Sequence, residues 1–131
     1  MRRLLSIAIV AAALVAAAVL TGASGDKSDK RTYRIVFDNS FGLVEGGDFR
    51  VGGVRAGKTS KFDVMKKKGE PAKAVAIAEI SQPGFDDFRK DATCEILPQS
   101  LIGEYYVDCQ PGQSSERLPT DGTGTVPVNQ T

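Results

Sequence analysis

Short runs in which apolar and polar residues alternate fill most of the chain after residue 30. In the first run, Tyr33, Ile35 and Phe37 occupy every second position, which is the period of a strand with one buried face. Phe49 and Val51 alternate with Arg50 in the same way, and further short runs rich in apolar or β-branched residues follow at 54–64, 74–80, 93–97, 105–109 and 126–128. Only residues 85–91, FDDFRKD, indicate a helix, and then one of a turn or two. Many short strands with glycines between them predict an all-β barrel or sandwich.

A long apolar run precedes this domain. Arg2 and Arg3 come first, residues 4–20 are apolar apart from one serine, and no further charge occurs before Asp26. As a helix this run would rise roughly 26 Å, slightly less than a bilayer core of about 30 Å. Residues 21–23, TGA, would lengthen the span, but they also look like a signal-peptide cleavage site. Composition therefore leaves open both an uncleaved anchor and a cleaved export signal.

Either alternative exports the rest of the chain, because the two N-terminal arginines stay on the cytoplasmic side. We divide the sequence into an N-terminal anchor or signal at residues 1–23, a polar linker at 24–31 and a β-domain at 32–131. The chain has 17 basic and 16 acidic residues, and without Arg2 and Arg3 the basic count falls to 15. The three lysines at 66–68 precede Gly-Glu-Pro, which favours a solvated hairpin tip over a binding patch. A near-neutral exported domain predicts no nucleic-acid partner.

The residue types that carry most enzymatic chemistry are missing or isolated. The chain has no histidine, which removes Ser-His-Asp and Cys-His arrangements, the usual general base and the commonest metal ligand. Asp86, Asp87 and Asp91 lie close together in sequence, but a calcium loop requires a denser pattern of oxygen ligands. We therefore interpret them as part of a polar turn. We expect no catalytic residue, no metal and no cofactor, and hence no enzyme.

One segment nevertheless matches a nucleotide-binding motif. Residues 52–59, GGVRAGKT, fit the P-loop pattern G-x-x-x-x-G-K-[ST]. A P-loop lies between a parallel strand and a helix whose N-terminal amides hold the phosphates. Here residues 60–71, SKFDVMKKKGEP, show no apolar stripe of helical period. We therefore interpret Gly52 and Gly53 as a turn between strands, and Gly57 as a bulge or a close backbone contact.

Two longer segments resemble one known family. Residues 37–58, FDNSFGLVEGGDFRVGGVRAGK, have the aromatic strand, the Gly-Leu turn, the acidic-Gly pair and the Val-x-Gly-Val pattern that open the MCE domain (mammalian cell entry, or MlaD-like). Residues 91–112, DATCEILPQSLIGEYYVDCQPG, resemble that family's Asp-Ala-Thr strand, Ser-Leu-Leu-Gly loop, Tyr-Val-Asp strand and Pro-Gly more specifically. Ala56 and Ile102 stand where valine and leucine are usual. The resemblance spans about residues 33–131.

The resemblance implies a seven-stranded MCE-type β-barrel held at the inner or cytoplasmic membrane by one N-terminal transmembrane helix. It therefore favours an uncleaved anchor at residues 4–23. It also implies a homo- or hetero-hexameric ring that binds lipid for an ABC-type transport system, with a membrane permease and a cytoplasmic ATPase as partners. Two alternatives are an exported adhesion or host-interaction module and a monomeric lipid-binding barrel with an internal cavity.

The two cysteines of the chain lie on the two predicted strands that flank residues 98–103. If these strands pair antiparallel so that residue numbers sum to 203, Cys94 faces Cys109 and Ile96 faces Val107. An exported domain is in an oxidising compartment, so we expect a disulfide, with two separate buried thiols as the alternative. A slip of one residue would place the sulfurs on opposite faces of the sheet.

The loop between these strands, PQSLIG at residues 98–103, is unusually apolar. Loops normally meet water and are polar, and two adjacent residues of an extended strand cannot both face the core. Leu101 and Ile102 are therefore either folded back and buried against the barrel, or they project and meet their copies around a sixfold axis. We expect the second arrangement, in which six Leu-Ile pairs form an apolar pore for lipid.

Overall fold

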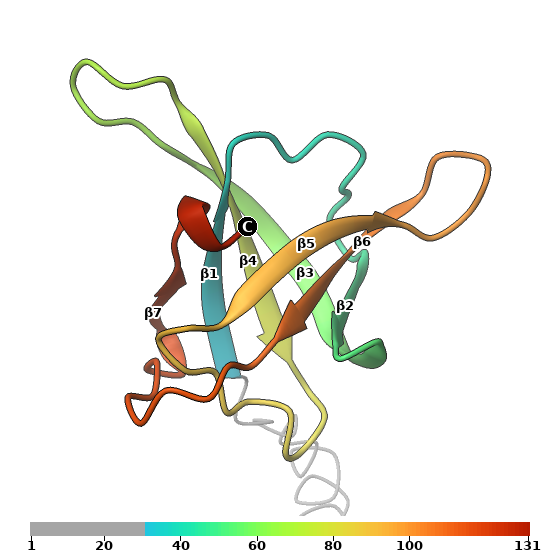
Figure 1. Cartoon of the computed structure of the whole chain (residues 1–131). Coiled ribbons are helices and arrows are strands. Elements are labelled where there is room, and N and C mark those ends of the chain that lie inside the picture. The colour runs from blue at the N-terminus through green and yellow to red at the C-terminus, as the bar shows by residue number, and fades with distance from the viewer. Residues whose placement is uncertain (1–30) are drawn as a thin grey trace, which may run out of the picture.

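One sheet of seven strands makes up the part of the chain that the structure, a computed structural model, describes: residues 31–131 (Figure 1). The elements are β1 (Arg31–Phe37), β2 (Asp48–Val51), β3 (Val54–Met65), β4 (Lys73–Ile80), β5 (Thr93–Pro98), β6 (Tyr105–Gln110), β7 (Asp121–Val126) and the 3-10 helix η1 (Val128–Gln130). The all-β prediction is confirmed. The predicted anchor at residues 4–23 lies outside the described residues, and within these no helix has the length and apolarity to span a bilayer.

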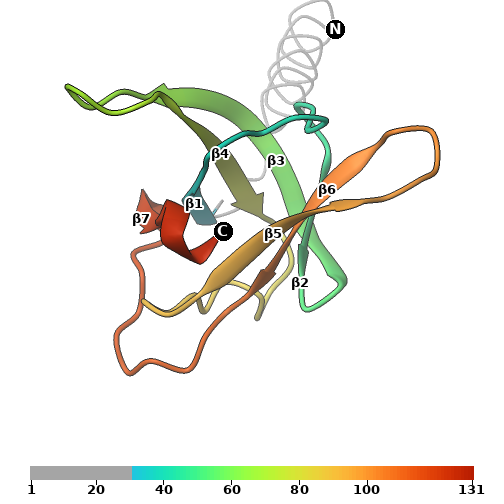
Figure 2. The ribbon, with the colours of Figure 1, turned by 45° about the horizontal axis from the view of Figure 1, so that its top comes forward.

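The sheet curls into a half-barrel and its strands do not close the ring. Its order is β5-β6-β2-β3-β4-β1-β7, so β5 and β7 are edges (Figure 2). The β1–β7 and β2–β6 pairs are parallel and the other four pairs are antiparallel. η1 lies between the two edges: the Thr131 hydroxyl donates to the Val36 carbonyl in β1 (2.9 Å), and the Gln130 side chain donates to the Lys90 carbonyl shortly before β5 (2.9 Å). The C-terminal segment thus connects the two sides of the gap.

Residues 85–91 are irregular, so the prediction of a short helix there was wrong. Phe88 is 1% exposed and belongs to the core. The Lys90 N–H donates to the Glu116 carbonyl (3.0 Å), and the Leu118 N–H donates to the Phe88 carbonyl (2.8 Å). Because these backbone groups bond to a distant segment, they are not available for helical hydrogen bonds. Tertiary contacts therefore override the local pattern.

The last strand also differs from the prediction. The alternation at residues 126–128 indicated a strand around Pro127, whereas β7 ends at Val126 and η1 follows. Proline has no N–H to donate to a ladder, which explains why the strand stops there. β7 contains Gly122 and Gly124, so it lacks the apolar alternation by which the other strands were predicted. Its parallel pairing with β1 defines it instead.

Aromatic rings fill the concave side of the sheet. Tyr33, Phe49 and Phe88 are each at most 1% exposed. The ring centroids of Tyr33 and Phe88 are 4.7 Å apart, and those of Phe49 and Phe88 are 6.2 Å apart. Ile35 and Phe37 join this cluster, as their alternation in the sequence predicted. The half-barrel therefore encloses a packed core.

Candidate functional site

The β5–β6 hairpin projects from the body of the domain and carries the apolar loop at its tip (Figure 1). Its ladder ends at the pair Pro98 and Tyr105. Beyond it Leu101 is fully exposed and Ile102 is 88% exposed. Gly103 has a φ of 96°, a left-handed conformation that glycine adopts without strain, and it returns the chain to β6. In the single chain, the pair therefore projects into solvent and does not fold back against the barrel.

Contacts on both faces hold the base of this hairpin. The Tyr105 ring lies 6.5 Å from the Phe41 ring, and it packs so closely on Gly42 that a Cβ there would be 2.3 Å from it. The Arg50 guanidinium lies over the Tyr106 ring, 4.1 Å from its centroid, in a cation–π contact. Neighbouring residues of a strand point to opposite faces, so Tyr105 and Tyr106 fasten the hairpin from both sides. These contacts orient the base of the hairpin relative to the sheet.

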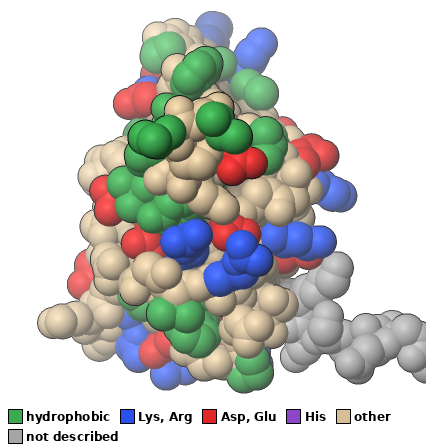
Figure 3. Space-filling model, turned by 90° about the vertical axis from the view of Figure 1, so that its right-hand side faces the viewer, with side chains coloured by type: hydrophobic (Ala, Val, Ile, Leu, Met, Phe, Trp, Pro, Cys, Tyr) green, Lys and Arg blue, Asp and Glu red, His purple; other side chains and the backbone are tan. Residues whose placement is uncertain are grey.

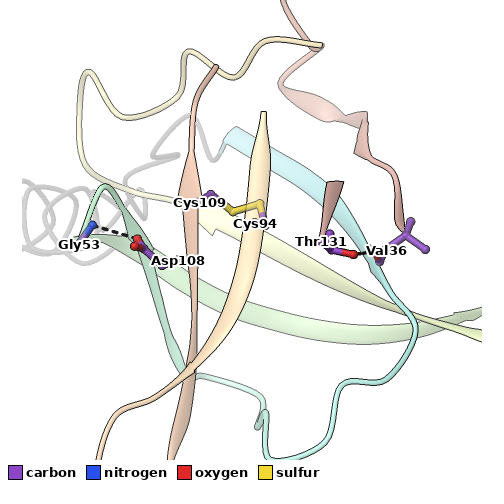
Figure 4. Close-up of a disulfide and its surroundings, with 6 residues drawn as sticks. All are labelled: Val36, Gly53, Cys94, Asp108, Cys109 and Thr131. Carbon is purple, nitrogen blue, oxygen red and sulfur yellow. Dashed lines mark hydrogen bonds between the residues drawn. A yellow bond between two sulfur atoms is a disulfide. The ribbon is translucent and has the colours of Figure 1, made fainter. Parts of the chain in front are cut away.

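A disulfide joins Cys94 and Cys109 within the same hairpin (Figure 4). The two cysteines are ladder partners, and Ile96 faces Val107, so the predicted register is confirmed. Both cysteines are at most 4% exposed. β6 is the only strand that pairs with β5 in the described sheet. The disulfide therefore links an edge strand covalently to its neighbour.

The segment that matches a P-loop begins with a tight turn. Gly52 and Gly53 join β2 to β3 and have φ values of 58° and 81°. Positive φ at both central residues is typical of the two-residue turns that match the twist of a hairpin. The Gly53 N–H donates to the Asp108 carboxylate (3.0 Å), which ties this turn to β6 (Figure 4).

The remainder of the segment continues as a strand. At Gly57 a Cβ would lie 1.9 Å from the Glu79 carbonyl oxygen, so β3 and β4 approach too closely for any side chain. Lys58 is exposed, and β3 runs on to Met65. No helix begins after the Gly-Lys-Thr residues, so this segment offers no helix N-terminus for phosphate.

The three clustered aspartates have separate structural partners. Asp86 pairs with Arg31 (2.9 Å), and Asp87 pairs with Arg117 (3.0 Å). Asp91 binds backbone instead, as described below. Within residues 31–131 no group of three or more acidic or cysteine side chains is arranged to hold a metal ion.

Asp91 organises the loop that follows β6. Its carboxylate accepts hydrogen bonds from the backbone N–H groups of Gln113 (2.9 Å) and Ser114 (2.8 Å). These bonds lower the pKa of the Asp91 carboxyl below its ordinary value, because they stabilise the ionised form. Gly112 has a φ of 84°, and a Cβ there would meet the carboxylate at 2.3 Å.

A second exposed apolar site was not identified from the sequence. Phe41 and Val44, in the loop between β1 and β2, are 78% and 61% exposed. Figure 3 shows hydrophobic side chains gathered on the upper part of the face from which the β5–β6 hairpin projects. The sequence feature that could have identified this site is an aromatic residue, Phe41, beside a glycine in a segment between two strands. We interpreted it only as part of the family pattern.

A family model described as "MlaD protein" matches residues 29–112, which include β1 to β6. This match covers more than half of the chain. The chain belongs to the MlaD family. Membership confirms the MCE/MlaD-like resemblance that the two sequence segments indicated.

The fold agrees with this membership. Among solved structures, a chain of the Acinetobacter MlaFEDB complex in its ATP-bound Vtrans1 conformation is similar, with a TM-score of 0.60 at 15% sequence identity. The alignment covers 95% of this chain and 88% of that chain. At such low identity the likeness shows a shared fold. A comparison with curated proteins finds no match.

Proposed function

We propose that this MlaD-family chain is a membrane-anchored, extracytoplasmic subunit of an ABC-type lipid transport system. Six MCE-type domains, identical or related, form a ring, and the Leu101–Ile102 loops narrow its central pore. The observation that carries the proposal is the fully projecting apolar loop on a hairpin held by contacts on both faces. Family membership and the fold shared with a chain of the MlaFEDB complex support it.

An apolar constriction separates lipid from ions on physical grounds. An acyl chain that passes six Leu-Ile pairs stays in contact with apolar surface, so it avoids the cost of meeting water. An ion in the same constriction loses its hydration without gaining polar partners, which is costly. Conduction of this kind requires no catalytic residue and no cofactor.

The other parts of the proposal are an anchor at residues 4–23 in the inner or cytoplasmic membrane, a permease and a cytoplasmic ATPase. ATP hydrolysis then belongs to a separate subunit. The exposed position of Lys58 on β3 agrees with this division, since nothing at the P-loop-like segment is built to hold phosphate.

The packed interior of the domain favours conduction of lipid between subunits over storage of a lipid inside a single subunit. A monomeric lipid-binding barrel requires a cavity between its walls, and here the rings of Tyr33, Phe49 and Phe88 occupy that space. The three most exposed large apolar side chains, Phe41, Leu101 and Ile102, lie on loops instead.

Purification of the full chain from its own membranes tests this function. A tagged protein extracted in mild detergent would be sized and its bound lipids extracted for mass spectrometry. We expect an assembly of six MCE-type domains with phospholipid or another membrane lipid. A monomer, or an assembly that carries no lipid, would contradict the proposal.

A further inference from the structure

The loop between β1 and β2 is ordered by many contacts although it exposes two large apolar side chains. Leu43 packs against the core. The Gly46 N–H donates to the Thr59 carbonyl (2.7 Å), and the Thr59 N–H donates to the Gly47 carbonyl (2.9 Å), so the loop is bonded to β3 from both directions. Phe41 and Val44, which we call the apolar knob, are thus presented in a fixed position. Clusters of exposed apolar side chains mark interaction sites.

An apolar hollow of about 320 Å³ lies at the base of the β3–β4 hairpin. It is on the outer face of the sheet, the face that points away from the aromatic core. Ile35 and Phe37 of β1 face the core, so Val36 between them faces outward and forms part of this hollow. We call it the outer hollow. Its apolar lining comes from Val36, Met65, Pro71, Pro127 and Val128.

The charges around the knob and the hollow are opposite. Glu45 follows Val44 directly, and Glu104 precedes Tyr105, the residue on which Phe41 rests; both glutamates are exposed. The lysines at 66–68 are exposed at the tip of the β3–β4 hairpin, as predicted, and Lys67 borders the outer hollow. Within residues 31–131 these two glutamates and three lysines have no ion-pair partner. Lys67, Lys73 and one acidic residue, Glu70, border the hollow, and Lys73 is ion-paired with Asp38.

The knob and the hollow lie toward different ends of the sheet. Phe41 rests on Tyr105 of β6, second in the strand order, whereas the hollow lies over β1 and β7 at the other end. Figures 1 and 2 both show the β1–β2 loop running toward β2 and β6, away from β7. A contact between two different patches of identical subunits is head-to-tail, and it produces a ring when its rotation closes.

We propose that the apolar knob of one copy docks in the outer hollow of the next copy, with Glu45 and Glu104 facing lysines 66–68. The inference deepens the proposed function, because it gives the proposed ring a subunit contact. The apolar surfaces supply the affinity, and the charges orient the two copies. Leu101 and Ile102 take no part in this contact, so they remain free to line the pore.

Photo-crosslinking of the full chain tests this contact. Phe41 is replaced by p-benzoylphenylalanine, which keeps an aromatic ring at the knob, and the assembly is irradiated in detergent and digested for mass spectrometry. We expect adducts of dimer mass that join residue 41 to peptides containing residues 62–73 or 125–131. The same probe at Val54, which is 52% exposed in the β2–β3 hairpin, is expected to give no adduct with those peptides.

The other outcomes overturn the inference. Adducts between two copies of residue 41 would indicate a symmetric contact, adducts with any other peptide of a second copy would place the interface elsewhere, and adducts with lipid alone would make the knob a lipid-binding surface. Sizing of the same sample distinguishes a failure of this subunit contact from a failure of the proposed ring. A six-domain assembly with adducts elsewhere rejects this contact and leaves the ring intact, whereas a monomer rejects the ring itself.

Discussion

Gly57 and Lys58 are neighbours in the sequence, and the structure gives them opposite importance. The sequence motif makes the lysine central, because a P-loop lysine binds phosphate. In the structure the lysine side chain is exposed, while the glycine lies where β3 and β4 come closest. The absence of a following helical pattern was enough to reject the motif. The close approach at Gly57 was expected only in general terms, because the register of β3 and β4, in which Gly57 faces Ile80, determines that the Glu79 carbonyl lies against it.

We expect Gly57→Ala to lower the free energy of unfolding by about 1–3 kcal/mol, since a Cβ would be forced against the Glu79 carbonyl. Lys58→Ala is the matched control and is expected to leave both stability and transport unchanged. Chemical denaturation of both variants measures the stabilities, and titration with Mg-ATP measures binding. Tight, magnesium-dependent ATP binding that disappears in Lys58→Ala would restore the P-loop interpretation.

Asp91 makes the stability of the domain depend on pH in the acidic range. The backbone hydrogen bonds from Gln113 and Ser114 lower the pKa of its carboxyl in the folded protein. The unfolded chain then binds the proton more readily, so the stabilising contribution is complete above the ordinary aspartate pKa of about 3.9. It is lost as the pH falls through the lowered pKa of the folded state.

We therefore expect Asp91→Asn to lower stability at neutral pH and to make the loss of stability in acid less steep. Denaturation at a series of pH values from neutral to strongly acidic checks this. Glu95→Gln, at an exposed position of β5, serves as the control. An unchanged acid profile in Asp91→Asn would show that the loop is held by other contacts.

At the scale of elements, six of the seven strands were predictable because they are short runs of alternating or β-branched apolar residues. β7 was not, because its glycines carry no such pattern and its pairing with β1 is between segments far apart in the chain. The register of β5 and β6 was predictable from the two cysteines, since only one antiparallel register places them opposite each other. The irregular course of residues 85–91 was not, because bonds to a distant segment determine it.

The disulfide between Cys94 and Cys109 closes a span with a sequence separation of 15. In the chain-entropy model such a span contributes about 3 kcal/mol. We expect Cys94→Ala with Cys109→Ala to lower the free energy of unfolding by roughly that amount, as measured by denaturant titration. Alkylation of the unfolded wild-type protein without reductant should add no mass. Two alkylated thiols in that experiment would mean that the bridge does not form in the cell.

At the scale of the whole molecule, the sequence indicated the family and the projecting Leu-Ile loop, but it did not indicate the knob or the outer hollow. The loop stands out in sequence because two adjacent apolar residues lie where a polar turn is normal. The hollow is assembled from the β3–β4 hairpin, β1 and the C-terminal segment, and its lining residues look like ordinary strand and turn residues until these segments meet. The knob is recognisable only once its loop is seen to be ordered and exposed.

The central claim is that Leu101 and Ile102 conduct lipid, and lipid transfer by the Leu101→Asn with Ile102→Asn variant tests it most directly. The side chains are exposed in the single chain, so polar replacements should leave folding and ring assembly unchanged. Reconstituted with the proposed permease and ATPase, the variant is expected to lose transfer of labelled lipid between membranes. Val54→Asn, another exposed apolar position, should transfer lipid normally. A double variant that assembles and transfers lipid at the wild-type rate would contradict the pore assignment, and one that no longer assembles would place the pair in a subunit contact.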